Sequence, residues 1–548
     1  MLIVARNWCS RGGVHATKSM ARPTGSSRAR GYAVLTSRAT LDALDLTKNK
    51  VQQIANVDSE KIDLAKIRVP IKANWASTQK IVVKSISKSI NIPNEEPVYL
   101  FFGGIPALMA AAKMKTKYPE RNLLFINNGI LSKSEQSGHQ AHNHPSEFVA
   151  ADCNKRNLAK TMARGLGILS SPDPTDIENY SYLHFPKIFK QFLEKPNQNL
   201  QLYTSFFKQR ILHDLTSKNG VSVQDRWLCR TIEKSLDFHE TLSDKIAAKT
   251  GLRTLKRDFR IYWSHDHKGI AAKEATWKEL GIPCETISEL ELIKRTILRL
   301  DKNLAVLKIS KDGQFEPETS KRVIKYFSDE YPDTFKVLEG EVNEIYTNPL
   351  THEPEAIKVK ENHGEIRIVP VKSVFGTPGH DQVFKYDPLN GTEKQLWKSV
   401  PVSGISSLWI CTIPRKELEN RWQINENEDA ELISHLTKIC PGANLCNLHV
   451  TVFDHEIRDE NVQLYVRASQ GANFNSNVAD KNDLVNIATN LDKFFIGDWR
   501  LISAGTCTRQ TGVTNVPTIS GMFGYDYSGV GYSASVPPDE NDPKPSLF

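Results

Sequence analysis

A chain of 548 residues, 39% hydrophobic and 24% charged, is long enough for more than one domain and has the composition of a globular protein rather than a disordered one. Its formal net charge of +8 is small for this length and arises partly from the N-terminus, so it gives no indication of nucleic acid as a partner. No apolar run approaches about 18 residues, so no transmembrane segment is expected, and eight cysteines without a CxxC pair give no zinc-ligand spacing.

The N-terminal segment is basic and free of acidic residues. Its first 41 residues contain seven Lys and Arg residues among Ser, Thr, Ala and Gly, but no Asp or Glu. An Arg-rich, acid-free leader is typical of a mitochondrial transit peptide. We therefore predict a transit peptide over residues 1–40 and a mitochondrial location; a disordered basic tail and a mispredicted start codon are the alternatives. Residues 41–95 are expected to form a helical lead-in and a connector with a short strand at 81–83.

The next segment has the pattern of a strand–turn–helix–strand unit. Residues 98–102 are an apolar run, Gly103-Gly104 form a turn, residues 106–114 have the composition of a helix, and residues 122–127 are a second apolar run. The unit spans roughly 30 residues, the length of a βαβ crossover. Backbone N–H groups at such a turn can bind a phosphate, which is the principle of a dinucleotide site.

The glycine motif of this turn is incomplete. Where G-x-G-x-x-G is usual, residues 102–107 read F-G-G-I-P-A, and Asn127 stands where an acidic residue would bind ribose hydroxyls. Ala107 is a common third residue, whereas Phe102 is harmless only if its ring points into the core, on the face opposite Phe101. Gly103, Gly104, Ala107 and Asn127 are the candidate cofactor-binding residues. An ordinary βαβ turn is the alternative.

A histidine-containing loop follows. His139, His142 and His144 are spaced at i, i+3 and i+5, but no carboxylate or cysteine at ligand spacing completes a metal site. Pro145 prevents a regular helix from aligning the three rings. A polar loop near a cofactor is therefore favoured over a metal centre.

The remainder alternates between helical and strand patterns. Residues 150–300 are interpreted as mostly helical, and from residue 401 the pattern becomes that of an antiparallel sheet. The end of the chain is first rich in glycine and then rich in Pro and Asp, which predicts a disordered tail over 538–548. The other expected elements are strands at 281–288, 304–309, 335–345, 408–412, 448–452 and 462–466, helices at 289–294 and 319–327, and a hairpin at 354–375.

Seven short phrases occur in a characteristic order. They are S-E-Q-S-G-H-Q-A at 134–141, G-I-P-C-E-T-I-S-E-L-E-L at 281–292, D-G-Q-F-E-P at 312–317, G-E-V-N-E-I at 340–345, P-V-S-G at 401–404, T-G-V-T-N-V-P-T-I-S at 511–520 and S-G-V-G-Y at 528–532. In this order they resemble FAD-dependent oxidoreductases of the D-amino-acid oxidase type, which include glycine and sarcosine oxidases. The resemblance extends over residues 97–537.

The resemblance implies an α/β fold: a discontinuous Rossmann-like FAD-binding domain with an α+β substrate domain built on an antiparallel sheet. The FAD domain would comprise residues 96–150, 300–400 and 495–537, and the helical insertion and substrate domain residues 151–299 and 401–494. Gly104 and Gly529 would then lie close together. By resemblance, the residues near FAD also include Ser137, Gly138, Gln140, Ala141, Ser528, Gly529, Val530, Gly531 and Tyr532.

The implied activity is oxidation of a C–N or C–OH bond in a small substrate that carries a carboxylate. The flavin would accept the hydride, with oxygen or a quinone as electron acceptor, and Arg509 is the candidate for binding the carboxylate. Phe102, Asn127, F-G-T-P-G at 375–379 and the lack of a helix after Ala534 depart from the family pattern and imply weaker binding of FAD. The alternatives are a 2-hydroxy-acid dehydrogenase resembling malate:quinone oxidoreductase, and a non-catalytic descendant that serves as a structural or interaction protein, for example in a larger assembly.

Overall fold

The computed structural model describes residues 80–87, 89–127, 142–143, 223–316, 318–351, 353–377, 382–397, 400–426, 428–444, 448–474, 481–511, 519–520 and 524–525. The chain divides into two units, Met1–Lys61 and Ile62–Phe548, and all described residues belong to the second. The expected transit peptide and C-terminal tail lie outside the described residues.

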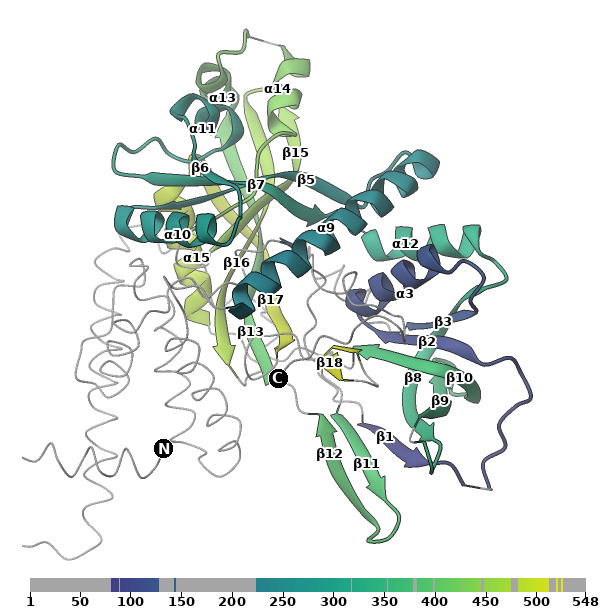
Figure 1. The fold of residues 1–548 in the computed structure, drawn as a ribbon. Coiled ribbons are helices and arrows are strands. Elements are labelled where there is room, and N and C mark those ends of the chain that lie inside the picture. The colour runs from purple at the N-terminus through teal and green to yellow at the C-terminus, as the bar shows by residue number, and fades with distance from the viewer. Residues whose placement is uncertain are drawn as a thin grey trace, which may run out of the picture. The chain divides into compact units, whose positions relative to one another are not determined.

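Eight strands form the first sheet, in the spatial order β12-β11-β1-β8-β3-β2-β10-β9 (Figure 1). The neighbours from β11 to β10 run parallel to one another, whereas β9 and β12 run antiparallel to their partners. The bounds are β1 (Lys80–Ser85), β2 (Val98–Gly103), β3 (Leu123–Asn127), β8 (Phe335–Thr347), β9 (Pro354–Glu361), β10 (Ile366–Thr377), β11 (Gln382–Asp387) and β12 (Thr392–Trp397).

The predicted strand–turn–helix–strand unit is confirmed as β2, α3 (Ile105–Lys117) and β3, which pair in parallel. The helix expected at 319–327 is α12 (Thr319–Glu330), and it contacts α3 and β8. Together α3 and α12 cover one face of the parallel strands (Figure 1). This arrangement gives the parallel strands the helical cover that a βαβ sheet requires.

The strands β8, β9 and β10 cover the other face and close a hydrogen-bonded circuit. β8 pairs first with β3 and then with β9. β9 also pairs with the first part of β10, and the later part of β10 pairs with β2. Side chains of the parallel strands and of these three strands share one apolar cluster, which includes Leu100, Ile126, Val342, Ile357 and Val374. The hairpin predicted over 354–375 is part of this circuit.

The second sheet has nine strands and is antiparallel except for the pair β5–β14. Its main path is β17-β13-β16-β15-β14-β5-β7-β4, with β6 beside β7, and a separate two-stranded sheet contains β18 (Ile519–Ser520) and β19 (Gly524–Tyr525). The bounds are β4 (His142–Asn143), β5 (Leu255–Ser264), β6 (Cys284–Thr286), β7 (Ala305–Phe315), β13 (Val400–Pro414), β14 (Gly442–Asn444), β15 (His449–Arg458), β16 (Asn461–Phe474) and β17 (Asp498–Thr511).

Six helices accompany this sheet in the described part of the chain. They are α9 (Val223–Thr250), α10 (His267–Glu279), α11 (Glu289–Arg295), α13 (Arg415–Trp422), α14 (Asp429–Leu436) and α15 (Lys481–Phe494).

The strand and helix expected after residue 281 correspond to β6 and α11. The mostly helical interpretation of residues 150–300 is wrong over β5, and the helices within 401–494 were not expected. The strands β7 and β17 pair in this second sheet, although sequence patterns placed their segments with the nucleotide domain.

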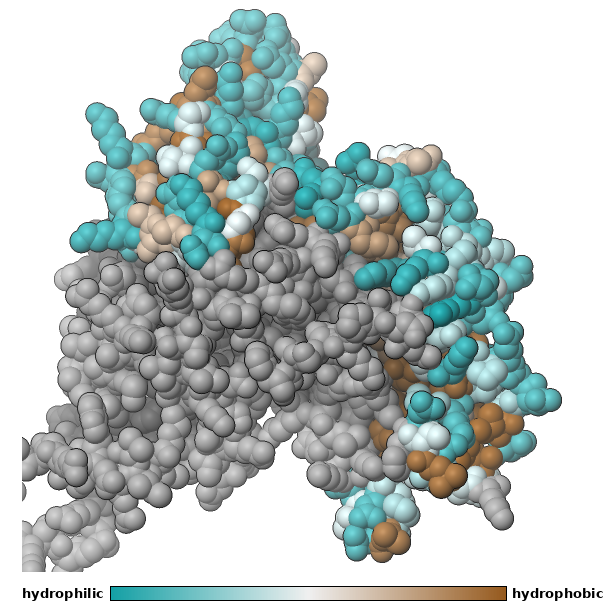
Figure 2. Space-filling model, in the orientation of Figure 1, coloured by the Kyte–Doolittle hydropathy of each residue, from teal (hydrophilic) through white to brown (hydrophobic). Residues whose placement is uncertain are grey.

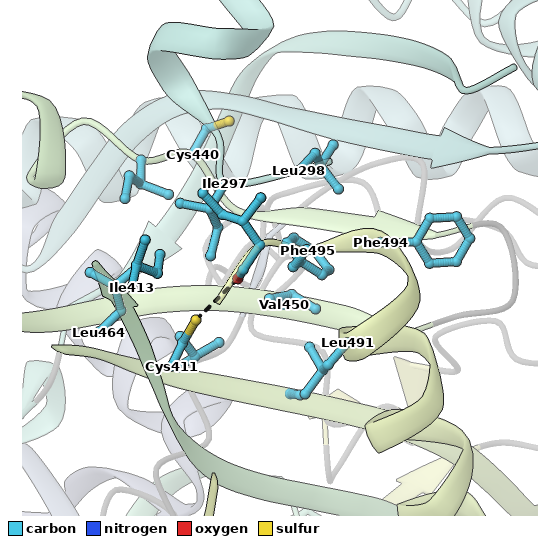
Figure 3. Close-up of a cluster of buried hydrophobic side chains, with 14 of the residues drawn as sticks. Ile297, Leu298, Cys411, Ile413, Cys440, Val450, Leu464, Leu491, Phe494 and Phe495 are labelled. Carbon is cyan, nitrogen blue, oxygen red and sulfur yellow. Dashed lines mark hydrogen bonds between the residues drawn. The ribbon is translucent and has the colours of Figure 1, made fainter. Parts of the chain in front are cut away.

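The core of the second sheet is formed by β13, β15, β16, α15 and the segment before β7 (Figure 3). Its side chains include Ile297, Val450, Leu464 and Leu491, all nearly inaccessible to solvent. The Cys411 thiol lies within this cluster and donates a hydrogen bond to the carbonyl of Ile496 over 3.3 Å. The strands predicted at 408–412, 448–452 and 462–466 are therefore confirmed as the frame of an apolar core.

The visible surface of the described residues is mainly hydrophilic, with some hydrophobic side chains near the ends of the β8–β9 and β11–β12 hairpins (Figure 2). At these two turns Leu350 and Leu389 are 88% and 92% exposed. Single exposed leucines are common on folded proteins. Among the described residues, no helix combines the length and apolar character needed to cross a bilayer.

The α/β fold class expected from the sequence is confirmed by this topology. Residues 80–127 and 335–397 build a Rossmann-like parallel sheet from separate segments, and an antiparallel sheet forms the second part. In such sheets, ligands bind at the carboxyl ends of the parallel strands, next to the turns that lead into the helices.

Candidate nucleotide-binding site

The turn between β2 and α3 brings its two glycines to the carboxyl edge of the parallel sheet. Gly103 has a φ of 121°, a backbone conformation that a side chain would strain, and Gly104 is the N-cap of α3. The N–H groups of Ala107 and Leu108 both donate to the Gly104 carbonyl, which starts the helix. The chain therefore turns sharply enough to present a helix N-terminus beside the end of β2.

Pro106 limits what this N-terminus can donate. It lies in the first turn of α3, where proline is sterically compatible with the helix but has no backbone N–H. The N–H groups of Gly104 and Ile105 precede the first bond within the helix, so they are the donors that the turn can direct at an anion. This loss of one donor was not anticipated from the sequence.

Phe102 and Phe101 lie on opposite faces of the sheet, as strand alternation predicted, and it is Phe102 that points away from α3. Its ring is 3% exposed and belongs to the cluster between the parallel strands and β8–β10, whereas Phe101 packs on the α3 face and contacts the ring of Phe375. The residue opposite Phe102 on β10 is Gly376, and a Cβ atom at Gly376 would overlap the Phe102 ring. The phenylalanine thus fills core space on the face opposite α3; in the turn itself Gly103 is buried and Gly104 is partly exposed.

Asn127 ends β3 in the position expected for a ribose-binding residue. The register places it directly beside Glu339 on β8, and its Nδ2 donates to the Glu339 Oε1 over 2.7 Å. Because Phe102 pairs with Ile126, the next residues of the two strands, Gly103 and Asn127, lie side by side. The ends of β2 and β3 and the point at which β8 passes from β3 to β9 therefore bring a glycine turn, an amide and a carboxylate together.

Lys115 fixes the opposite end of α3. Its side chain is fully buried, and its Nζ donates to the carbonyls of Pro119 and Arg121 and to the hydroxyl of Thr334, over 2.6, 2.7 and 2.5 Å. Burial lowers the pKa of Lys115 from 10.5 to about 8. These bonds tie the end of α3 to the segments that start β3 and β8, and so help to hold the helix whose first turn forms the site.

Most of the remaining residues expected near FAD lie outside the described part of the chain. These are Ser137, Gly138, Gln140, Ala141, Ser528, Gly529, Val530, Gly531 and Tyr532, so the expected proximity of Gly104 and Gly529 stays a prediction. Arg509 lies in β17, with its backbone opposite Val402. Of the three histidines weighed as metal ligands, His142 lies in β4 opposite Gln314, and the other two are outside the described residues.

A different group of possible metal ligands occurs at the β9–β10 turn. Glu361, His363 and Glu365 bring ligand atoms together there, and the imidazole Nε2 lies 3.2 Å from an oxygen of each glutamate. His363 and Glu365 are exposed. These contacts are those of a surface ion pair, and they do not indicate a metal.

The sequence interpretation missed Glu339, Pro106 and Gly376. Pro106 could have been recognised, because the absence of a proline N–H is a property of the residue alone. The contributions of Glu339 and Gly376 depend on which strands are neighbours and in which register they pair, and no local pattern in the sequence carries that information.

No protein-family model matches the chain, and no curated protein matches it in sequence. Among solved structures, it is similar to a glycine oxidase from Bacillus cereus, with 10% identity and a TM-score of 0.44 over 84% of this chain and 92% of that one. It is also similar to an L-proline dehydrogenase from P. horikoshii, with 12% identity and a TM-score of 0.40 over 84% of this chain and 90% of that one.

A third similar structure is the L-alpha-glycerophosphate oxidase from Mycoplasma pneumoniae with FAD bound, with 10% identity and a TM-score of 0.37 over 84% of this chain and 92% of that one. Glycine oxidase is one of the enzyme types that the sequence phrases resemble. At these identities and TM-scores, the similarities do not establish membership of a family or an activity.

Proposed function

We propose that this chain is an FAD-binding oxidoreductase. The observation that carries the proposal is the Gly103-Gly104 turn at the carboxyl edge of the parallel sheet, where Gly104 and Ile105 are partly exposed directly before the N-terminus of a 13-residue helix. A helix N-terminus of this kind favours a phosphate through its N–H groups and its dipole. Phe102 does not obstruct the turn, because its ring is in the core.

The residues at this edge fit a dinucleotide. Gly104 and Ile105 offer backbone N–H groups to a pyrophosphate, and the polar side chains of Asn127, at the end of β3, and of Glu339, within β8, are suited to ribose hydroxyls. When bound, a flavin accepts hydride from a C–N or C–O carbon. The proposed substrate is a small amine, amino acid or hydroxy acid with a carboxylate, for which Arg509 is the proposed binding residue, and oxygen or a quinone is the proposed electron acceptor.

Pro106 favours a second candidate. Its missing N–H removes one of the donors that a helix of this kind can offer to a phosphate. A chain that kept the fold but lost the cofactor could act as a structural or interaction protein. The two candidates differ in one measurable property, the binding of FAD.

The decisive experiment is an absorbance spectrum of the purified full chain near 450 nm, followed by calorimetric titration with FAD. FMN serves as the matched control ligand, because it lacks the pyrophosphate and adenosine that the turn and the side chains of Asn127 and Glu339 would bind. We expect saturable binding of FAD in preference to FMN. A colourless protein that stays without flavin in excess FAD would reject the first candidate and leave the second.

We also propose that the chain is imported into mitochondria, on the basis of its acid-free, arginine-containing leader. Residues 1–40 fused to a fluorescent reporter are expected to carry it into mitochondria. The control fusion replaces the seven Lys and Arg residues with Gln. A reporter that stays in the cytosol with the natural leader contradicts the proposal.

A further inference from the structure

The last residues of β2 and β3 lie in a common row with residues in the middle of β8, at the point where β8 passes from β3 to β9. Phe102, Ile126 and Leu338 are paired across β2, β3 and β8, and all three pack into the cluster shared with β9 and β10. Because successive side chains of a strand alternate between the faces of a sheet, the next residues, Asn127 and Glu339, direct their side chains to the other face. That is the face on which α3 begins.

The Glu339 carboxylate extends from β8 back toward β3. Parallel strands lie about 4.8 Å apart, so the Cα of Glu339 is two strand spacings from Gly103. Its Oε1 nevertheless accepts the hydrogen bond from Asn127 Nδ2 over 2.7 Å, which places the carboxylate at the end of the Asn127 side chain. An exposed negative charge is thus held at the tip of β3, although β3 itself ends in a neutral amide.

From this arrangement we infer that Glu339 is the ribose-binding carboxylate of the nucleotide site, supplied by β8 and oriented by Asn127. The inference rests on the proposed function, since it assigns a residue to the same site. A carboxylate is an acceptor with two oxygens, so Glu339 can bond to Asn127 through one oxygen and to a ribose hydroxyl through the other. The bond to the hydroxyl is charge-assisted, which makes it stronger than a bond from an amide alone.

The test measures the affinity of the full chain for FAD by calorimetry in four variants. Glu339→Gln removes the charge while preserving the shape, and Glu341→Gln removes an equal charge from an exposed residue two positions further along the same strand. Glu339→Asn shortens the side chain as well. In the fourth variant Asn127→Glu is combined with Glu339→Asn, so that the carboxylate moves to β3. Thermal unfolding of each variant confirms that it is folded.

We expect Glu339→Gln and Glu339→Asn to weaken FAD binding by about tenfold or more, because a hydrogen bond to a charged group is lost. Glu341→Gln should bind as the natural chain does, and the exchange variant should recover most of the affinity. Equal affinities of the natural chain and Glu339→Gln would overturn the inference and leave the proposed function intact.

Two other outcomes also count against the assignment. An exchange variant that is folded but as weak as Glu339→Asn would show that the loss arises from a disturbed strand end rather than from a missing carboxylate. A natural chain that does not bind FAD at all would reject the proposed function, and the assignment of Glu339 with it. That result is distinguishable from failure of the assignment alone, because it appears before any variant is compared.

Discussion

Phe102 and Gly376 are complementary: the ring on β2 occupies the volume that a side chain on β10 would need. A large residue at the position of the usual first glycine is therefore accommodated by a glycine on the neighbouring strand. The two departures from the expected pattern, at residue 102 and in the segment 375–379, form one packing arrangement. Neither is evidence that the glycine turn has lost its shape.

Gly376→Ala is expected to destabilise the protein by about 1–3 kcal/mol, because the added methyl group would overlap the Phe102 ring in a filled core. Chemical denaturation of the full chain measures the free energy of unfolding. The double variant Phe102→Leu with Gly376→Ala should be more stable than the sum of the two single changes predicts, since the smaller side chain makes room. Strict additivity would contradict the proposed complementarity.

Lys115→Met should change how stability depends on pH. The pKa of Lys115 is lowered to about 8 by burial, so between about pH 8 and pH 10.5 the unfolded chain retains a proton that the folded chain has released. Lys115 therefore makes the free energy of unfolding increase as the pH rises through this window, by as much as about 3 kcal/mol. Lys115→Met is expected to remove this increase. Chemical denaturation of the natural chain and of the variant at several pH values in this window measures the difference in the free energy of unfolding.

The same variant should be less stable at pH 7, by about 1–3 kcal/mol, because the carbonyls of Pro119 and Arg121 lose their donor. Lys117→Met, which removes an exposed lysine from the same helix, is the control. If both variants show the same pH dependence, Lys115 is not the group responsible.

Pro106→Ala should tighten FAD binding if the turn holds the pyrophosphate. Alanine restores a backbone N–H in the first turn of α3, and one more hydrogen bond to a phosphate can increase affinity by about tenfold. Calorimetry with the full chain measures the change, and Pro349→Ala, at an exposed turn, is the control. Unchanged affinity would mean that an N–H group at residue 106 does not contact the cofactor.

Cys411 and Cys440 should resist alkylation in the folded protein. Burial raises the pKa of both thiols, that of Cys440 to about 12, so little thiolate forms near neutral pH. Treatment with iodoacetamide at pH 8 followed by peptide mass spectrometry is expected to label the two residues only after denaturant is added. Labelling in the native state would show that the core around them opens readily.

The sequence indicates β2 and β3 of the first sheet well because they are apolar runs with clear boundaries, whereas β11 and β12 were not expected. The runs that became β2 and β3 are separated by a glycine turn and a helix with a typical composition, and strand alternation predicted that Phe101 and Phe102 lie on opposite faces of the sheet, where each is buried in a different cluster. β5 was missed because its last residues, from Phe259 to Ser264, are buried on both faces. A strand without a polar face has no period of two to distinguish it from a buried helix.

The candidate site was only partly predictable for a different reason. The glycine turn and Asn127 are local features, and both were found. The pairing of Asn127 with Glu339 joins residues 212 positions apart in the sequence, and it follows from the order and register of strands. Without an experimentally or computationally determined strand order, Glu339 is one of 63 acidic residues with nothing to single it out.

The hydrogen-bonded circuit of β8, β3, β2, β10 and β9 has a consequence for biosynthesis. β2 and β3 are made early, but the strands that pair with their outer edges, β8 and β10, follow only after residue 335. More than 200 further residues must therefore leave the ribosome after β3 before those edges are covered. Unpaired edges of apolar strands readily associate with other chains. Retention by a chaperone should accordingly last until about residue 377 has been synthesised, and then end abruptly as the last pairing closes the circuit.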